Sequence, residues 1–408
     1  MTRAGSSIGI AMIGAGTMAG AHSAALTLLE VLYLELPLRP RLVAVADVNG
    51  GLASRLADRF GYGRAERDWR PVVEAADVDL VVACLPPLLN HEVVLAAAAA
   101  GKHVVCEKPL AESAASAAEL LAACRTAGVF HGLGAAYRWT PALRAIRGMI
   151  EGDELGEVRS LQAAFMLDYA ADPEVPLLWR FQRSLAGGGI MIDTGYHLVD
   201  CARFLVGEID TVQSLTSTFI TERPQPAADA IGNRGGGANR STDSAHGPVD
   251  VEDAAAALVS FSNGAYGVLE TSRVAIGRRV SLRLEVFGSK GSAGWDLEQP
   301  DEFRVCLPGD PSTFGYRRVL VNPTHPGASE LLIGGTDGTS IGWLGQGCAM
   351  WAEFLSAIAE GRPAHADFED GVRANAVVDA IYAAALSGTR TAVVDTADLD
   401  PALHGTLA

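Results

Sequence analysis

The segment Cys106-Glu107-Lys108-Pro109-Leu110 places two ionisable side chains directly after residues 101–105, a stretch that ends in the apolar pair Val104-Val105. The β-branched pair in that stretch is typical of a buried strand, and the proline ends it because proline cannot donate to a strand ladder. Buried charges are costly unless they face a partner or a ligand, and open α/β sheets bind ligands at the carboxyl ends of their strands. A solvated ion pair is the alternative, but this position makes Lys108 a candidate for chemistry.

A second group of polar side chains follows the glycine triplet at residues 187–189. The sequence predicts a helix from Ile190, on which Asp193, His197 and Asp200 are spaced i, i+4 and i+7 and therefore share one face. An aspartate one turn from a histidine can orient the imidazole and make it more basic, which suits a general base near neutral pH. A solvated polar face is the alternative. A metal site is disfavoured because no further His or Cys lies nearby.

The N-terminus carries the pattern of a dinucleotide site. An apolar strand at residues 8–13 is followed by Gly14-Ala15-Gly16-Thr17-Met18-Ala19 and then by a helical segment. The first glycine permits a tight turn, the second lets the backbone approach a pyrophosphate, and the small alanine lets the helix pack closely. The phosphates would lie at the helix N-terminus. We expect Gly14, Gly16, Thr17 and Met18 to contact the cofactor.

The next strand, residues 42–46, ends in Asp47. An acidic residue there accepts hydrogen bonds from the ribose hydroxyls and repels a 2′-phosphate. A proline-bounded insert at residues 33–40 explains why Asp47 lies farther from the glycines than is usual. Because Val48-Asn49 supplies no arginine to hold a phosphate, the sequence favours NAD over NADP. A merely polar strand end is the alternative.

Strands and helices alternate over roughly the first 130 residues, which predicts a doubly wound parallel sheet, a Rossmann domain. From Val158 the chain changes to long runs rich in Val, Thr, Phe and Leu, which predict a mostly antiparallel sheet. These runs are residues 158–169, 211–221, 255–262, 265–274 and 280–287, with shorter ones at 292–297, 303–307 and 317–321. Helices are expected at residues 348–360 and 368–386. We expect domains at residues 1–133 and 134–408, with a flexible insert at residues 223–248, which are rich in Gly, Pro, Asn, Ser and Ala.

The composition limits the class of function. The chain has 408 residues and a net charge of −16, which disfavours nucleic acid and anionic membrane surfaces as partners. Neither a signal peptide nor a membrane span is expected. The six cysteines are scattered without a Cys-x-x-Cys pair, which indicates a reducing compartment, hence the cytoplasm, and no metal.

Several motifs occur together in one order. They are Gly-x-Gly-x-x-Ala with His22 shortly after, Leu85-Pro86-Pro87 with His91, Glu107-Lys108-Pro109-Leu110, Tyr137-Arg138 and Asp193-x-Gly195-x-His197. Over roughly residues 8 to 390 the chain resembles the glucose–fructose oxidoreductase, inositol dehydrogenase and rhizopine catabolism protein family of NAD(P)-dependent sugar and cyclitol dehydrogenases. Two features depart from the family pattern. Ala136 replaces a common Asn, and the insert at residues 223–248 has no counterpart.

The resemblance implies a Rossmann domain followed by a domain whose large open sheet carries helices on one face and serves oligomerisation, as a dimer or tetramer. It implies catalysis at the cleft by Lys108, Asp193 and His197. The cofactor would be NAD, without a metal. The resemblance also implies that further residues contact the cofactor: Leu85, Pro86, His91, Glu107 and Lys108. The substrate contacts would be Lys108, Tyr137, Arg138, Trp179, Arg180, Asp193 and His197.

The expected reaction is the reversible oxidation of a secondary ring hydroxyl in a neutral sugar or cyclitol, such as an inositol, a pyranose or an anhydrosugar like levoglucosan. A neutral substrate is favoured because Arg138, Arg180 and Arg183 do not form a cluster typical of phosphate capture. The sequence leaves open whether Lys108 or His197 accepts the proton. Two alternatives are a non-catalytic NAD or sugar sensor of the same fold and an NAD-dependent glycosidase that works by oxidation and elimination. The Gly-His-Gly-Gly type motif of such glycosidases is absent.

Overall fold

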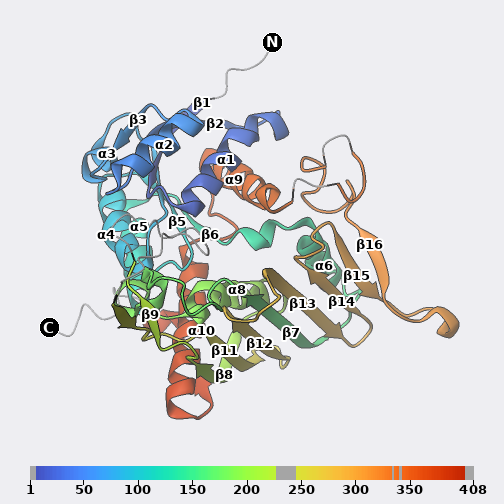
Figure 1. The fold of residues 1–408 in the computed structure, drawn as a ribbon. Coiled ribbons are helices and arrows are strands. Elements are labelled where there is room, and N and C mark those ends of the chain that lie inside the picture. The colour runs from blue at the N-terminus through green and yellow to red at the C-terminus, as the bar shows by residue number, and fades with distance from the viewer. Residues whose placement is uncertain (1–5, 227–244, 333–334, 340–341, 400–408) are drawn as a thin grey trace. The chain divides into compact units, whose positions relative to one another are not determined.

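The computed structural model describes residues 6–226, 245–332, 335–339 and 342–399 (Figure 1). The chain forms two compact units. The first comprises Met1–Ala136, Leu344–Asn375 and Asp395–Ala408, and the second comprises Tyr137–Trp343 and Ala376–Val394. The segment Leu344–Asn375 therefore groups with the N-terminal unit. The expected division after residue 133 had placed this segment in the second domain.

The first unit contains a six-stranded sheet in the order β3-β2-β1-β4-β5-β6, in which all neighbours are parallel. Its strands are β1 (Ser6–Ile13), β2 (Leu38–Ala46), β3 (Arg64–Glu66), β4 (Leu80–Ala83), β5 (His103–Glu107) and β6 (His131–Gly134). Its helices are α1 (Thr17–Leu32), α2 (Gly50–Phe60), α3 (Arg70–Glu74), α4 (Pro87–Ala99), α5 (Ala114–Ala127) and α9 (Trp343–Glu360). The expected doubly wound sheet is confirmed.

Local residue chemistry sets the ends of these helices. The Asn49 side chain accepts from the first backbone N–H groups of α2, which ends at Gly61 with φ of 76°. Ser113 caps α5 in the same way, and Gly128 ends it with φ of 64°. Both stops use the left-handed conformation that glycine adopts without steric cost.

The second unit is built on a nine-stranded sheet in the order β16-β15-β14-β13-β7-β12-β11-β8-β17. Its strands are β7 (Val158–Leu167), β8 (Ile209–Ser217), β11 (Ala254–Phe261), β12 (Tyr266–Ser272), β13 (Val280–Gly288), β14 (Ser292–Asp296), β15 (Glu302–Cys306), β16 (Arg317–Leu320) and β17 (Thr391–Ala392). Neighbours are antiparallel except β7 and β12. The expected mostly antiparallel sheet is confirmed. The helices are α6 (Pro141–Glu151), α7 (Arg183–Ala186), α8 (Tyr196–Leu205) and α10 (Phe368–Ser387), whose first residues belong to the first unit.

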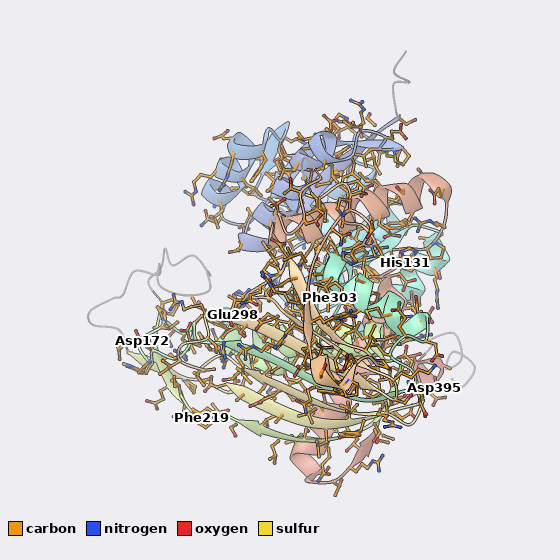
Figure 2. The ribbon with its side chains drawn as sticks, turned by 90° about the vertical axis from the view of Figure 1, so that its right-hand side faces the viewer. His131, Asp172, Phe219, Glu298, Phe303 and Asp395 are labelled. Carbon is orange, nitrogen blue, oxygen red and sulfur yellow. The ribbon has the colours of Figure 1, made fainter. Side chains whose placement is uncertain are left out.

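Helices α6 and α8 lie on one face of this sheet (Figure 1). On the other face, alternate residues of three neighbouring strands are open to solvent: Leu215 is 75% exposed, Leu258 55% and Tyr266 59%. Figure 2 shows the strands running across the unit, with the exposed Phe219 at the outer side of the sheet. The sheet therefore has one covered and one open face.

The expectation of a flexible insert across residues 223–248 is wrong at both ends. Strand β9 (Glu222–Pro224) pairs with β10 (His246–Pro248) in an antiparallel ladder. Arg223 is fully buried, donates to the carbonyl oxygens of Ala170, Asp172 and Val175, and stacks on the ring of Phe181. These partners are distant in sequence, so composition could not indicate them. Residues 227–244 lie outside the described residues.

Within the described part of the chain, no helix is long and apolar enough to cross a membrane. The same residues contain no cluster of three or more His, Cys, Asp or Glu side chains able to hold a metal ion.

Candidate cofactor and catalytic sites

The glycine turn after β1 has the geometry that a dinucleotide needs. Gly14 has φ of 96°, and a Cβ there would collide with the carbonyl oxygen of Cys84, so only glycine fits. Its N–H donates to the Ala46 carbonyl at 2.8 Å. A Cβ built on Gly16 meets nothing within 4 Å, which leaves open space for a pyrophosphate. Thr17 and Met18 form the first turn of α1, whose N-terminus has no side-chain cap and is suited to a phosphate.

We predict that Gly16→Ala weakens NADH binding by roughly tenfold, about 1.4 kcal/mol, without lowering thermal stability. The added methyl group fits the fold, since Gly16 has φ of −78° and open space beside it, but it occupies the approach to the pyrophosphate. Titration of NADH fluorescence and thermal unfolding measure the two effects. Gly14→Ala is the matched control and should lower thermal stability. Unchanged NADH affinity in Gly16→Ala would contradict the prediction.

Asp47 follows β2 and ties this strand to the glycine turn. Its Oδ2 accepts from the Ala15 N–H at 2.8 Å, and its Oδ1 accepts from the Asn49 N–H at 2.8 Å. Each carboxylate oxygen has two lone pairs, so the group keeps capacity to accept from ribose hydroxyls. Its expected contact with the cofactor stays a prediction.

Arg67 is a residue that sequence reasoning missed. Its Nη2 donates to the carbonyl of Val48 at 3.4 Å, and its side chain lies along Gly50 at the start of α2. Residues 48 and 49 supply no arginine, but the fold brings one from beyond β3 to the same turn. The spacing of residues along the chain did not indicate that Arg67 would lie beside Val48 and Gly50.

Glu107, at the end of β5, is buried and paired with His22, which is itself held by Trp351. Its Oε1 lies 2.8 Å from Nε2 of His22, whose Nδ1 accepts from the indole N–H of Trp351 at 3.0 Å. Since Nδ1 is an acceptor, the proton of a neutral imidazole is on Nε2 and is donated to the Glu107 carboxylate. This network anchors the residue directly before Lys108. Sequence reasoning had noted His22 but not Trp351.

The other expected cofactor residues lie around the end of β4. Leu85 and Pro86 connect β4 to α4, and the Leu85 N–H donates to the Asn90 side chain at 3.3 Å. The imidazole Nε2 of His91 lies 3.0 Å from Glu119 Oε2 on α5. The contacts of these residues with the cofactor stay predictions.

In the second unit, five expected residues make contacts at or near a π-helical turn, Met191–Gly195, that continues into α8. The Asp193 Oδ2 lies 3.5 Å from Arg180 Nε, with both side chains largely buried. The Arg180 guanidinium stacks on the Trp179 ring at 4.1 Å. One turn after Asp193, the His197 ring contacts the edge of Tyr137 at a centroid distance of 4.9 Å.

The helical spacing predicted that Asp200 shares a polar face with Asp193 and His197. In the structure its side chain lies in the interior instead. It is 1% exposed and accepts from Arg138, which is 8% exposed, with Nη2–Oδ1 at 2.6 Å and Nε–Oδ1 at 2.9 Å. The buried guanidinium supplies a counter-charge that draws this carboxylate inward. The contact of Arg138 with substrate stays a prediction, and the contacts that the structure gives it are those of a structural ion pair.

Comparison with known proteins identifies the family. Residues 8–134 match the oxidoreductase family with an NAD-binding Rossmann fold, and residues 143–294 match the GFO/IDH/MocA C-terminal domain. The chain belongs to the GFO/IDH/MocA family. Family membership confirms the expected resemblance, and the protein is an oxidoreductase whose cofactor is NAD.

Individual members of the family match between about two thirds and nearly all of the chain. Levoglucosan dehydrogenase of Pseudarthrobacter phenanthrenivorans is 35% identical over 381 residues, 93% of this chain and 96% of its own. Myo-inositol 2-dehydrogenase of Thermotoga maritima is 27% identical over 285 residues, 69% of this chain and 73% of its own. A solved structure of levoglucosan dehydrogenase with NADH and levoglucosan has a TM-score of 0.88 at 32% identity, and covers 95% of this chain and 100% of that one.

Proposed function

We propose that this enzyme oxidises a secondary ring hydroxyl of a neutral sugar or cyclitol to the ketone, reversibly, with anhydrosugars such as levoglucosan as the leading substrates. The observation that carries the proposal is the group around Asp193. It combines an aromatic ring on Trp179, a carboxylate on Asp193 and an imidazole on His197, each partly exposed. An aromatic face suits the C–H side of a sugar ring. The names of the relatives that bind levoglucosan and inositol support the same substrate class.

In this proposal the protein's own residues manage the proton and the charge. His197 takes the hydroxyl proton as general base, and Asp193 accepts from a neighbouring hydroxyl of the substrate. Lys108 stabilises the alkoxide character that develops on the reacting oxygen. Bound NAD⁺ supplies the hydride acceptor.

The arginines of the second unit favour a neutral substrate. The Arg180 guanidinium lies against Asp193 and Trp179, and the Arg138 guanidinium lies against Asp200. Phosphate and carboxylate groups are usually held by arginines that offer a bidentate fork. Because these two guanidinium groups already face carboxylates, an anionic substrate would have to compete with them.

The decisive experiment is NADH formation at 340 nm with a panel of levoglucosan, myo-inositol, scyllo-inositol, glucose, glucose 6-phosphate and gluconate. We expect one neutral ring to give the highest kcat/KM, since hydrogen-bonding sites discriminate strongly between hydroxyl patterns. A phosphorylated or carboxylated sugar as the best substrate would refute the neutral class. NADH binding without turnover on a wider sugar panel would favour the sensor, and glycosidic cleavage without net NADH would favour the glycosidase.

We predict that NADH binds at least roughly tenfold more tightly than NADPH, about 1.4 kcal/mol, because the Asp47 carboxylate repels a 2′-phosphate. Asp47→Ala should reduce the preference. Arg67→Ala is the companion variant, and it should lower whatever NADPH affinity exists because Arg67 lies at the same turn. Fluorescence titration with both reduced cofactors measures these affinities, and equal affinities in the wild type would remove the prediction.

We also propose a homo-oligomer, dimer or tetramer, formed through the open face of the nine-stranded sheet. Leu215 and Leu258 lie on neighbouring strands there, and apolar side chains exposed on an open sheet favour a partner. The double variant Leu215→Asp/Leu258→Asp should give a smaller species in light scattering. Leu34→Asp, at an exposed leucine of the other unit, should not. A monomeric wild type at micromolar concentration would contradict the proposal.

The six cysteines of the chain are all free thiols in the structure. Free thiols persist in reducing compartments, which supports the proposal of a cytoplasmic enzyme.

A further inference from the structure

The backbone just before the Asp193 turn is held by one remote carboxylate. Glu252 is 4% exposed and lies at the entry to β11. Its Oε2 accepts from the Gly189 N–H at 3.1 Å, and its Oε1 accepts from the Met191 N–H at 2.9 Å. Its own carbonyl accepts from the Ile190 N–H at 3.1 Å. Three consecutive N–H groups at the start of the helical segment are therefore satisfied by a single residue.

Tyr382 of α10 completes this arrangement. Its hydroxyl donates to Glu252 Oε1 at 2.8 Å and accepts from the Gly189 N–H at 3.2 Å. Burial, reinforced by the Glu252 charge, raises the pKa of Tyr382, so the hydroxyl keeps its proton and remains a donor. With three donors directed at it, the Glu252 carboxylate acts purely as an acceptor.

The glycines at this point are required by the same two side chains. A Cβ on Gly188 would collide with the Tyr382 hydroxyl, and a Cβ on Gly189 would collide with Glu252. The backbone is thus packed directly against the carboxylate and the phenol. Flexibility does not explain these two glycines, because they allow a close approach that any larger residue would prevent.

The position of Asp193 depends on this anchored backbone. The Asp193 N–H donates to the carbonyl of Gly189 at 3.2 Å, so the residue held by Glu252 also begins the turn that carries Asp193. That turn is π-helical, a conformation that is rare and concentrated at functional sites. His197 follows at the start of α8. A shift of Gly189 would therefore displace both side chains.

We propose that Glu252, supported by Tyr382, is a positioning residue that sets the orientation of Asp193 and His197 for proton transfer. This inference rests on the proposed function of those two residues. The Glu252 carboxylate acts on Asp193 and His197 through the backbone of residues 189–191.

The test uses Glu252→Gln, Tyr382→Phe and the double variant that combines them. Asp250→Asn is the control. The control removes a carboxylate charge from the same loop, where Asp250 accepts from the Arg183 N–H and not from residues 189–191. Each variant is measured for kcat, KM, NADH affinity, thermal unfolding and amide hydrogen exchange over residues 187–196. We expect kcat to fall roughly 10–100-fold in Glu252→Gln, in line with the effects of misplaced catalytic groups. KM and NADH affinity should change less than about threefold, and exchange should accelerate in this segment.

The kcat of the double variant should be no lower than that of Glu252→Gln, since both side chains belong to one hydrogen-bond network. A folded Glu252→Gln with wild-type kcat overturns the positioning role, and so does a loss of kcat that only parallels a general loss of fold. If Glu252→Gln fails to fold, Tyr382→Phe decides, with wild-type kcat counting against the proposal. Near-wild-type turnover in both Lys108→Ala and His197→Ala would instead refute the catalytic assignment on which this inference rests, whatever the effect of Glu252→Gln.

Discussion

Lys108→Ala and His197→Ala are each expected to lower kcat by about 10²–10⁴, the range for loss of a group that transfers or stabilises a proton. Lys108 follows the anchored Glu107 at the end of β5, and His197 begins α8 one turn after Asp193. NADH affinity should survive in His197→Ala, because the glycine turn and Asp47 belong to the other unit. Steady-state kinetics and NADH titration measure the two quantities.

Two surface variants serve as controls for these replacements. Lys290 pairs with Asp153 on the surface, and the His365 side chain is 69% exposed. Lys290→Ala and His365→Ala should therefore keep turnover close to that of the wild type. Near-wild-type turnover in both Lys108→Ala and His197→Ala would refute the catalytic assignment. A defect in only one of them would identify the residue that carries the proton step.

Asp200→Ala is expected to cost about 3–5 kcal/mol of unfolding free energy, because it leaves the buried Arg138 guanidinium without its carboxylate. Domains are commonly stable by about 5–15 kcal/mol, so the loss is a large fraction of the total. Urea denaturation followed by circular dichroism measures it as a lowered midpoint. The structural role of the pair predicts that stability falls even when substrate and cofactor are absent.

Glu151→Ala is the matched control for this variant. It also removes a carboxylate from an arginine, but the Arg147–Glu151 pair is exposed. Exposed pairs contribute roughly 0–1 kcal/mol, so the midpoint should hardly move. Equal midpoints for Asp200→Ala and the wild type would show that the buried pair does not make the expected contribution to stability.

The amino-acid sequence by itself determined the two types of sheet and the glycine turn after β1. Gly14 and Gly16 were identified from their spacing after an apolar strand, and the structure gives each the geometry expected of it. Most strands of the second sheet were predicted from long runs rich in Val, Thr, Phe and Leu. These features are local, because a φ above zero or an apolar run is determined by neighbours along the chain.

Only the tertiary structure decided which charged and polar side chains meet. The sequence placed Asp200 beside His197 by helical spacing, but the fold pairs it with Arg138 in the interior. It identified the glycine triplet without the Glu252 carboxylate that the triplet packs against. Such partners lie far apart in the chain, and pairing between them leaves no periodic pattern. A buried charge is stable only where its counter-charge and hydrogen-bond donors converge, and that convergence is a property of the packed fold.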